Sequence, residues 1–189
     1  MTRKSKYRIG ELLFQIIPVT IGVFLGFLVS NLAEKSKTQN NSTTFRQSLI
    51  EEIKSNKRKI EKNLDYHVML RDSARYYSTS GELTKRPEFF RGLRTWALTS
   101  SAFETGLQTG IINELEFNNI QLVNNSYNLQ NSYNEFSKML LSGFMTKDFD
   151  SNDWQKIARY LAVGMSDVVI KETELIEEYE ILLKELETD

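Results

Sequence analysis

The stretch that decides the fold is LLFQIIPVTIGVFLGFLVSNL, residues 12–32, which holds 21 residues and no charged side chain. At 1.5 Å per residue, a helix of this length spans about 30 Å, the thickness of the hydrocarbon core of a bilayer. The run is longer than the apolar core of a cleavable signal peptide, and the best cleavage site, after Ala33, has an unsuitable Asn31 three positions before the cut. The sequence therefore predicts an uncleaved transmembrane anchor.

Charged residues flank this anchor unequally. Four basic residues precede it: Arg3, Lys4, Lys6 and Arg8. Glu11 is the acidic residue on that side, whereas residues 33–37 contain two lysines and one glutamate. Because cytoplasmic flanks carry the excess of lysine and arginine, the N-terminus is predicted to be cytoplasmic. The rest of the chain is then predicted to lie in the periplasm, with the anchor in a bacterial inner membrane.

Small residues recur every fourth position within the anchor, at Gly22, Gly26 and Ser30. On a helix these three share one stripe, which lets two helix backbones approach closely. Glycine is also common in transmembrane helices without any such role. Our hypothesis is that the stripe is a transmembrane helix interface, either for self-association or for another membrane protein.

The chain after the anchor is nearly neutral and lacks cysteine. Its 156 residues from position 34 carry 20 basic and 24 acidic side chains, which offers no electrostatic case for nucleic acid as a partner. The absence of cysteine excludes disulfides, thiolate metal sites and a thiol nucleophile. Two prolines and nine glycines in the whole chain are few, and this composition favours helices over a β-sandwich.

Apolar residues recur at helical spacing in three long segments, from residue 45 to about 77, from about 115 to 143, and from about 151 to 186. Between the first two, Pro87 indicates an irregular stretch whose aromatic residues fold back on the core. The predicted fold is all-α, with an N-terminal transmembrane helix followed by an up-and-down helical bundle. The predicted parts are a basic cytoplasmic tail (1–10), the anchor (11–33), a polar linker (34–44) and the bundle domain (45–189). Thr43 or Thr44 is expected to cap the first bundle helix.

The last predicted helix has the clearest pattern, a strict heptad of five apolar residues: Trp154, Leu161, Val168, Leu175 and Leu182. Its second half is strongly acidic, and it could lie against the basic residues between Lys54 and Lys62 if the two helices are antiparallel neighbours. The same heptad could instead form a coiled coil with another copy of the chain.

No set of residues indicates catalysis or a cofactor. His67 is the one histidine, and a single histidine without cysteine cannot build an ordinary zinc site. It lies next to an apolar stripe, so a packed or half-exposed histidine is predicted. Motifs for a serine nucleophile, a phosphate loop and a di-iron bundle are absent. The asparagine-rich stretch 118–134 could form a hydrogen-bonding ladder across helices, but we favour an exposed polar face.

Two parts of the chain carry a resemblance. The first is Gly10-Glu11, then IIPVTIGVFLGFLVSNLAE, then the charged stretch FRQSLIEEIKSNKRKIEKNL; the second is LTSSAFE from Leu98, then Gly110, then a helix with Tyr127. Together they resemble a family of small single-pass bacterial membrane proteins classed as a domain of unknown function. The chain departs from that pattern at Leu32-Ala33-Glu34, where a tryptophan before the acidic residue is expected. The resemblance implies the topology and no activity, cofactor or site residue.

These observations favour a non-enzymatic interaction or structural subunit of a membrane assembly, whose partners are the lipid bilayer and either itself or another membrane protein. No catalytic, cofactor-binding or metal-binding residue is predicted. The alternative is a periplasmic sensor-type helical bundle that binds a small ligand in its core and signals through partner helices.

Overall fold

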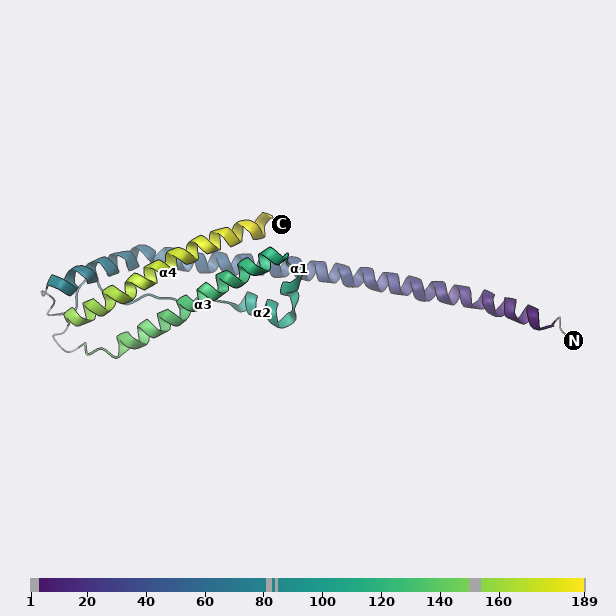
Figure 1. The fold of residues 1–189 in the computed structure, drawn as a ribbon, viewed down its shortest axis with the longest axis horizontal. Helices are drawn as coiled ribbons and strands as arrows, with labels where there is room; N and C mark the ends of the chain where they lie inside the picture. The colour runs from purple at the N-terminus through teal and green to yellow at the C-terminus, as the bar shows by residue number, and fades with distance from the viewer. Residues whose placement is uncertain (1–3, 81–82, 84, 150–153, 189) are drawn as a thin grey trace. The chain divides into compact units, whose positions relative to one another are not determined.

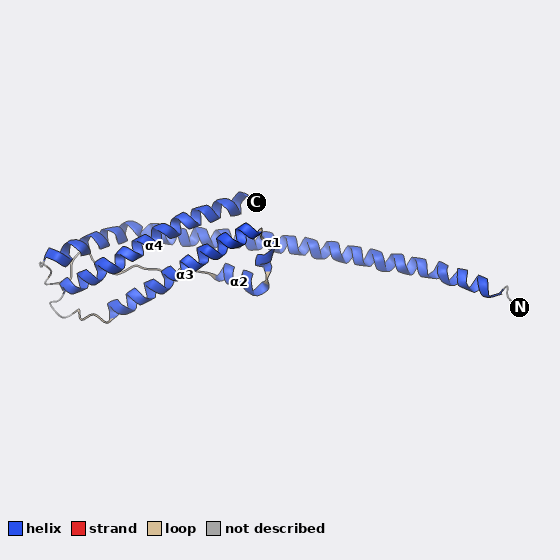
Figure 2. Cartoon of the chain, in the orientation of Figure 1, coloured by secondary structure: helices blue, strands red, loops and turns tan. Residues whose placement is uncertain are grey.

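The structure, a computed structural model, describes residues 4–80, 83, 85–149 and 154–188, with side chains for residue 14 and from residue 16 onward. All regular secondary structure in these residues is helical (Figure 2). The elements are α1 (Lys4–Ser80), α2 (Ser101–Thr109), the 3-10 helix η1 (Ile111–Glu114), α3 (Phe117–Met145) and α4 (Trp154–Thr188). The predicted fold class, a long apolar N-terminal helix followed by a helical bundle, is confirmed.

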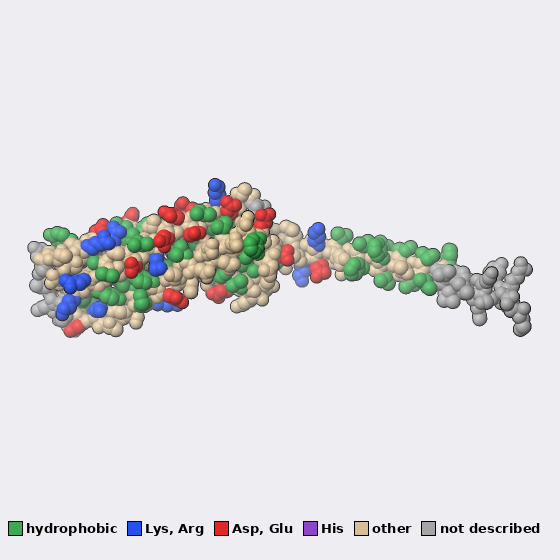
Figure 3. All heavy atoms as spheres, in the orientation of Figure 1, with side chains coloured by type: hydrophobic (Ala, Val, Ile, Leu, Met, Phe, Trp, Pro, Cys, Tyr) green, Lys and Arg blue, Asp and Glu red, His purple; other side chains and the backbone are tan. Residues whose placement is uncertain are grey.

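The chain divides into two compact units, Met1–Thr44 and Phe45–Asp189. The first unit is helical from Lys4 and belongs to α1. This helix contains an 18-residue window that is long and apolar enough to cross a membrane, and none of that window is buried. In the space-filling view, hydrophobic side chains cover the described surface of this window (Figure 3). The first unit therefore presents its apolar side chains outward.

The polar residues 34–44 are helical rather than a separate linker between two helices. The hydroxyl of Thr43 donates a hydrogen bond to the carbonyl of Gln39 at 3.0 Å, and that of Thr44 to the carbonyl of Asn40 at 2.9 Å. These are bonds of the helix interior, so the predicted cap at Thr43 or Thr44 is wrong. Asparagine, serine and threonine cost only a few tenths of a kcal/mol each in a helix, and no glycine or proline lies between residues 27 and 80 to end it.

The second unit is built on three long helices. These are α1 from Phe45 onward, α3 and α4, and in Figure 1 α4 runs opposite to the other two. Contacts fix the directions. Lys54 contacts Glu187 and Arg75 contacts Ser166, so α1 and α4 are antiparallel.

Helices α1 and α3 run in the same direction, since Glu52 contacts Tyr127 and Asn56 contacts Gln130. The chain must therefore return along the bundle between them. Residues 85–100, which we call the return segment, do so without regular secondary structure (Figure 1). Phe90 is buried in the core, as predicted for the aromatic residues of this stretch, and Leu93 and Leu98 are buried as well. The same prediction is wrong for Trp96, which is 58% exposed.

The core of the second unit lies between these helices. All five heptad residues of α4 named above are buried within the chain, together with Leu49, Ile53 and Ile60 of α1. A coiled coil with another copy would need this same stripe. Helix α4 also approaches α3 closely at Gly164, where an added Cβ atom would lie only 2.2 Å from Cδ1 of Leu140. The heptad is thus used inside the bundle.

Candidate functional site

The interior of the second unit contains polar side chains among the apolar ones. Those that define the site come from the three long helices and are at most 4% exposed: Asn56 and His67 of α1, Tyr127, Gln130 and Tyr133 of α3, and Glu172 and Tyr179 of α4. A buried polar group costs stability unless it is hydrogen-bonded, so its partners are informative.

His67, Glu172 and Tyr133 form one group, which we call the His67 cluster. The imidazole Nδ1 of His67 lies 2.8 Å from Oε2 and 3.0 Å from Oε1 of Glu172. Its Nε2 lies 2.9 Å from the carbonyl oxygen of Leu93 in the return segment. The hydroxyl of Tyr133 donates to Oε1 of Glu172 at 2.9 Å. The cluster therefore joins α1, α3, α4 and the return segment at one buried point.

The partners of His67 restrict where protons can be. The Leu93 carbonyl only accepts hydrogen bonds, so Nε2 of His67 must carry a hydrogen. Nδ1 and the Glu172 carboxyl then share one further proton, as imidazolium with carboxylate or as imidazole with carboxylic acid. Both arrangements leave the cluster without net charge. Burial, followed by the charge of Glu172, raises the pKa of Tyr133, which keeps its phenol protonated and able to donate.

A second group, the amide cluster, consists of Asn56, Gln130 and Tyr179 around the main chain of Thr99. Nδ2 of Asn56 donates to the Thr99 carbonyl at 2.7 Å, and Oδ1 of Asn56 accepts from the Thr99 amide at 3.1 Å. Gln130 donates to the same carbonyl at 3.0 Å and accepts from Asn56 at 3.0 Å and from the Tyr179 hydroxyl at 2.5 Å. Burial, followed by the charge of Glu52, raises the pKa of Tyr179.

Other side chains hold the rest of the return segment. Asn134 accepts from the Leu98 amide at 2.9 Å and donates to the Leu98 carbonyl at 3.0 Å. The hydroxyl of Tyr66 accepts from the Arg91 amide at 2.9 Å and donates to the Gly92 carbonyl at 2.6 Å. Side chains of α1 and α3 thus satisfy main-chain groups that a neighbouring strand would satisfy in a sheet.

Glu52 fixes the end of the return segment. Its carboxylate accepts from the Ala102 amide at 3.0 Å and from the Ser101 hydroxyl at 2.9 Å, at the start of α2. A negative charge is favourable at the N-terminus of a helix. The Tyr127 hydroxyl donates to the same carboxylate at 2.7 Å, and burial, followed by this hydrogen bond, raises the pKa of Tyr127.

The predicted packing of His67 is confirmed, since its side chain is fully buried. Its partner Glu172 was missed because it lies 105 residues further along the chain. A signal was present, because Glu172 falls between Val168 and Leu175 on the heptad stripe, where an apolar residue is expected. For the asparagine-rich stretch 118–134 we favoured an exposed polar face, and several of its asparagines are indeed exposed. Gln130 and Asn134 instead form hydrogen bonds to other elements, as expected from the alternative of a ladder across helices.

The structure places Gly22, Gly26 and Ser30 on exposed positions of α1 in the first unit. A Cβ atom added to Gly22 or Gly26 would meet nothing within 4 Å. The small-residue stripe is therefore open to a partner helix in the single chain, and its role as an interface stays a prediction.

The predicted pairing of the acidic end of α4 with the basic part of α1 is confirmed. Nζ of Lys54 lies 2.6 Å from Oε1 of Glu187, and Nζ of Lys57 lies 2.8 Å from Oε1 of Glu180. Exposed pairs of this kind contribute at most about 1 kcal/mol each. They complement the packing of the two helices rather than create a binding surface.

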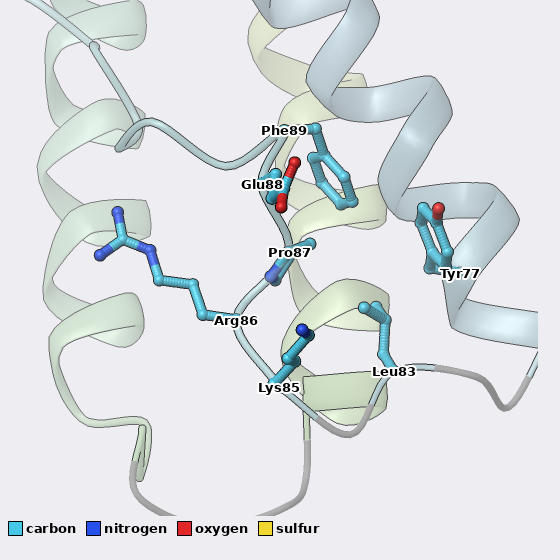
Figure 4. Close-up of a pocket in the computed structure, with 7 residues that line it drawn as sticks. All are labelled: Tyr77, Leu83, Lys85, Arg86, Pro87, Glu88 and Phe89. Carbon is cyan, nitrogen blue, oxygen red and sulfur yellow. The ribbon is translucent and has the colours of Figure 1, made fainter.

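A surface depression of about 530 Å³ lies at the beginning of the return segment (Figure 4). Its lining residues are Tyr77, Leu83, Lys85, Arg86, Pro87, Glu88 and Phe89. The rings of Tyr77 and Phe89 stack with centroids 5.4 Å apart. The charged lining side chains are all exposed. The depression therefore lacks the buried polar anchors that give a small-molecule site its specificity.

Among the residues that the structure describes, no group of three or more histidine and acidic side chains is arranged to hold a metal ion. Comparisons of the chain with protein-family models, with curated proteins and with solved structures found no match.

Proposed function

We propose that this chain is a single-pass membrane protein whose helical domain acts as a non-enzymatic interaction or structural subunit of a membrane assembly. The observation that carries the proposal is the exposed apolar helix of the first unit. Residues 16–32 are uncharged and exposed in the single chain. Each Å² of apolar surface left in water costs about 25 cal/mol, so lipid or a partner helix must cover this surface.

The interior of the domain supports an interaction subunit rather than the sensor-type alternative. The buried imidazole, carboxylate and amide groups of the two clusters already bond to one another or to the return segment. A ligand that entered between them would have to replace these bonds, and a buried group left unpaired costs about 1–3 kcal/mol. Recognition is therefore assigned to the outer surfaces of the helices.

Membrane insertion is tested with the full chain expressed in bacteria. We expect the protein to sediment with membranes, to resist extraction by alkaline carbonate and to require detergent for purification. The control is a variant with Ile21→Lys and Leu25→Lys, which should weaken insertion, because a lysine near the centre of a transmembrane helix costs about 2.5–3.5 kcal/mol. A wild-type protein that stays in solution without detergent would contradict the proposal.

The proposed orientation, with the N-terminus in the cytoplasm and the domain in the periplasm of a bacterial inner membrane, rests on the flanking charges. Alkaline phosphatase fused after Asp189 should be active, because it folds only outside the cytoplasm. Green fluorescent protein fused at the same residue should be dark after export. The reverse pair of results would place the domain in the cytoplasm.

Self-association through the anchor is the proposed use of the small-residue stripe. Replacing Gly22 and Gly26 by isoleucine should reduce the oligomeric mass in mild detergent, because bulky side chains keep the helix backbones apart. The matched control replaces Phe24 and Leu28, on the opposite face of the same helix, by isoleucine. An unchanged mass in the glycine variant would leave the stripe without a role in self-association.

A further inference from the structure

We propose that the His67 cluster is a proton-dependent latch that holds the return segment on the bundle. The cluster is a buried point at which side chains of α1, α3 and α4 meet the main chain of the return segment, and of the two such points it is the one that contains an imidazole and a carboxyl group. His67 makes the contact with that segment, through the Leu93 carbonyl at 2.9 Å. The latch goes beyond the proposed function, because it concerns how one segment of the domain is kept in place.

The proton count of the cluster carries the argument. Both ring nitrogens of His67 face oxygen atoms, so the docked arrangement holds one hydrogen on Nε2 and one between Nδ1 and Glu172. Removing the shared proton leaves a net negative charge in the core, and Nδ1 or Nε2 then presents a lone pair to an oxygen less than 3.1 Å away. Adding a second proton to the pair leaves a net positive charge. Either buried, unpaired charge is strongly unfavourable.

In the part of the chain that the structure describes, the contacts around the cluster bring no second cation or carboxylate to compensate for such a change. From α4 the cluster is faced by Glu172, and from α3 by the protonated phenol of Tyr133. On α1 itself the ring of Tyr66 lies 5.8 Å from the ring of His67. In the return segment, Arg94 is exposed, and its guanidinium carbon lies over the ring of Tyr66, 4.6 Å from the ring centroid. The proton balance of the cluster is therefore decided within it.

Release of the segment relieves the charge. In the docked state the return segment lies on the bundle, and in the released state Leu93 has moved away and water reaches His67. The hydrated ring no longer needs a hydrogen on both nitrogens. At any pH where a hydrated histidine is neutral, the docked state therefore holds one more proton than the released state. An ordinary histidine is neutral above a pH of about 6.5. By linkage, the docking equilibrium then falls about tenfold for each pH unit. The outward side chains of the segment, Arg91, Arg94 and Trp96, would lose their fixed arrangement at the same time.

The test measures the protonation of His67 and the docking of the return segment in the same sample, the full chain in detergent micelles, at a series of pH values. His67 is the one histidine, so its ring nitrogens give single signals in a ¹⁵N spectrum that need no assignment. Hydrogen exchange of the Leu98 and Thr99 amides reports docking, because both donate to side chains of α1 or α3. We expect their protection to fall about tenfold per pH unit as the ring loses its proton. The amides of α3 should keep their protection.

Glu172→Gln is the decisive variant. An amide at this position can donate to Nδ1 and accept from Tyr133 without any shared proton, so docking should become independent of pH between about 7 and 9, where the released histidine is neutral as well. Tyr133→Phe is the matched control, because it removes one hydrogen bond from the same carboxylate and leaves the proton count unchanged; its docking should keep the pH dependence of the wild type. Constant protection of Leu98 and Thr99 in the wild type over this range, loss only together with α3, or unchanged pH dependence in Glu172→Gln would each overturn the latch.

Discussion

Raising the pH above about 10 is expected to destabilise the domain progressively, because the fold holds three phenols in their protonated form. Tyr127, Tyr133 and Tyr179 are at most 4% exposed, and burial is the main reason that their pKa values lie above the ordinary value of about 10. A raised pKa means that the folded state keeps a proton that the unfolded state releases. The stability from these groups is therefore complete below pH 10 and is lost as the pH rises beyond it.

The size of this loss follows from the number of phenols. Each phenol removes about 1.4 kcal/mol from the free energy of unfolding per pH unit above 10. Three of them remove about 4 kcal/mol by pH 11, compared with a total stability of about 5–15 kcal/mol for an ordinary domain. The loss is thus a large share of what holds the bundle together.

The assay is thermal unfolding followed by circular dichroism at a series of pH values, with ultraviolet absorbance of phenolate recorded in parallel. Tyr133→Phe should reduce the pH dependence by about a third, whereas Tyr76→Phe, at a position 62% exposed, should leave it unchanged. Phenolate absorbance of the three buried groups should appear only with the loss of helix. If all tyrosines ionise at ordinary pH values while the helices remain, the argument from burial is refuted.

Three further changes test the packing, each by urea denaturation of the full chain. Gly164→Ala should destabilise the domain by about 1–3 kcal/mol, because its Cβ would enter the space of a leucine on α3, whereas Val163→Ala on the exposed side should stay within about 0.5 kcal/mol. Asn56→Ala should cost about 1–3 kcal/mol because it leaves the Thr99 amide without its acceptor, whereas the Thr99 carbonyl keeps Gln130; the exposed Asn131→Ala should cost little. Lys54→Ala should cost less than about 1 kcal/mol, because its ion pair is half exposed.

Helical periodicity was enough to predict the fold class and most of the core. The heptad from Trp154 to Leu182 placed one buried stripe correctly. The acidic end of α4 was expected against the basic part of α1 if the two helices were antiparallel neighbours, and the structure meets that condition. These signals are local or repetitive, so they can be read without knowing the neighbours. The cap predicted at Thr43 failed because weak helix formers continue a helix when no glycine or proline interrupts it.

The path of the return segment could not be predicted in the same way. Its main chain bonds to the side chains of Asn56, Asn134 and Tyr66, which lie far away in the sequence. Such bonds impose no repeating pattern on the segment itself. They depend on α1 and α3 running in parallel, and that arrangement becomes visible only when the helices are packed. The polar clusters were missed for the same reason.

The buried pair of His67 and Glu172 gives the bundle a register that its apolar residues do not. The α4 stripe repeats every seven residues, so sliding α4 by one heptad along α1 would again place leucine and valine in the core. That slide would put Met165 or Tyr179 opposite His67 and leave Glu172 without its partner. Leaving one member of a buried pair of this kind without its partner costs up to about 3–5 kcal/mol, which is a large share of the roughly 5–15 kcal/mol that stabilises an ordinary domain. An acidic residue on an otherwise apolar heptad therefore selects one alignment of helices that packing alone would leave nearly degenerate.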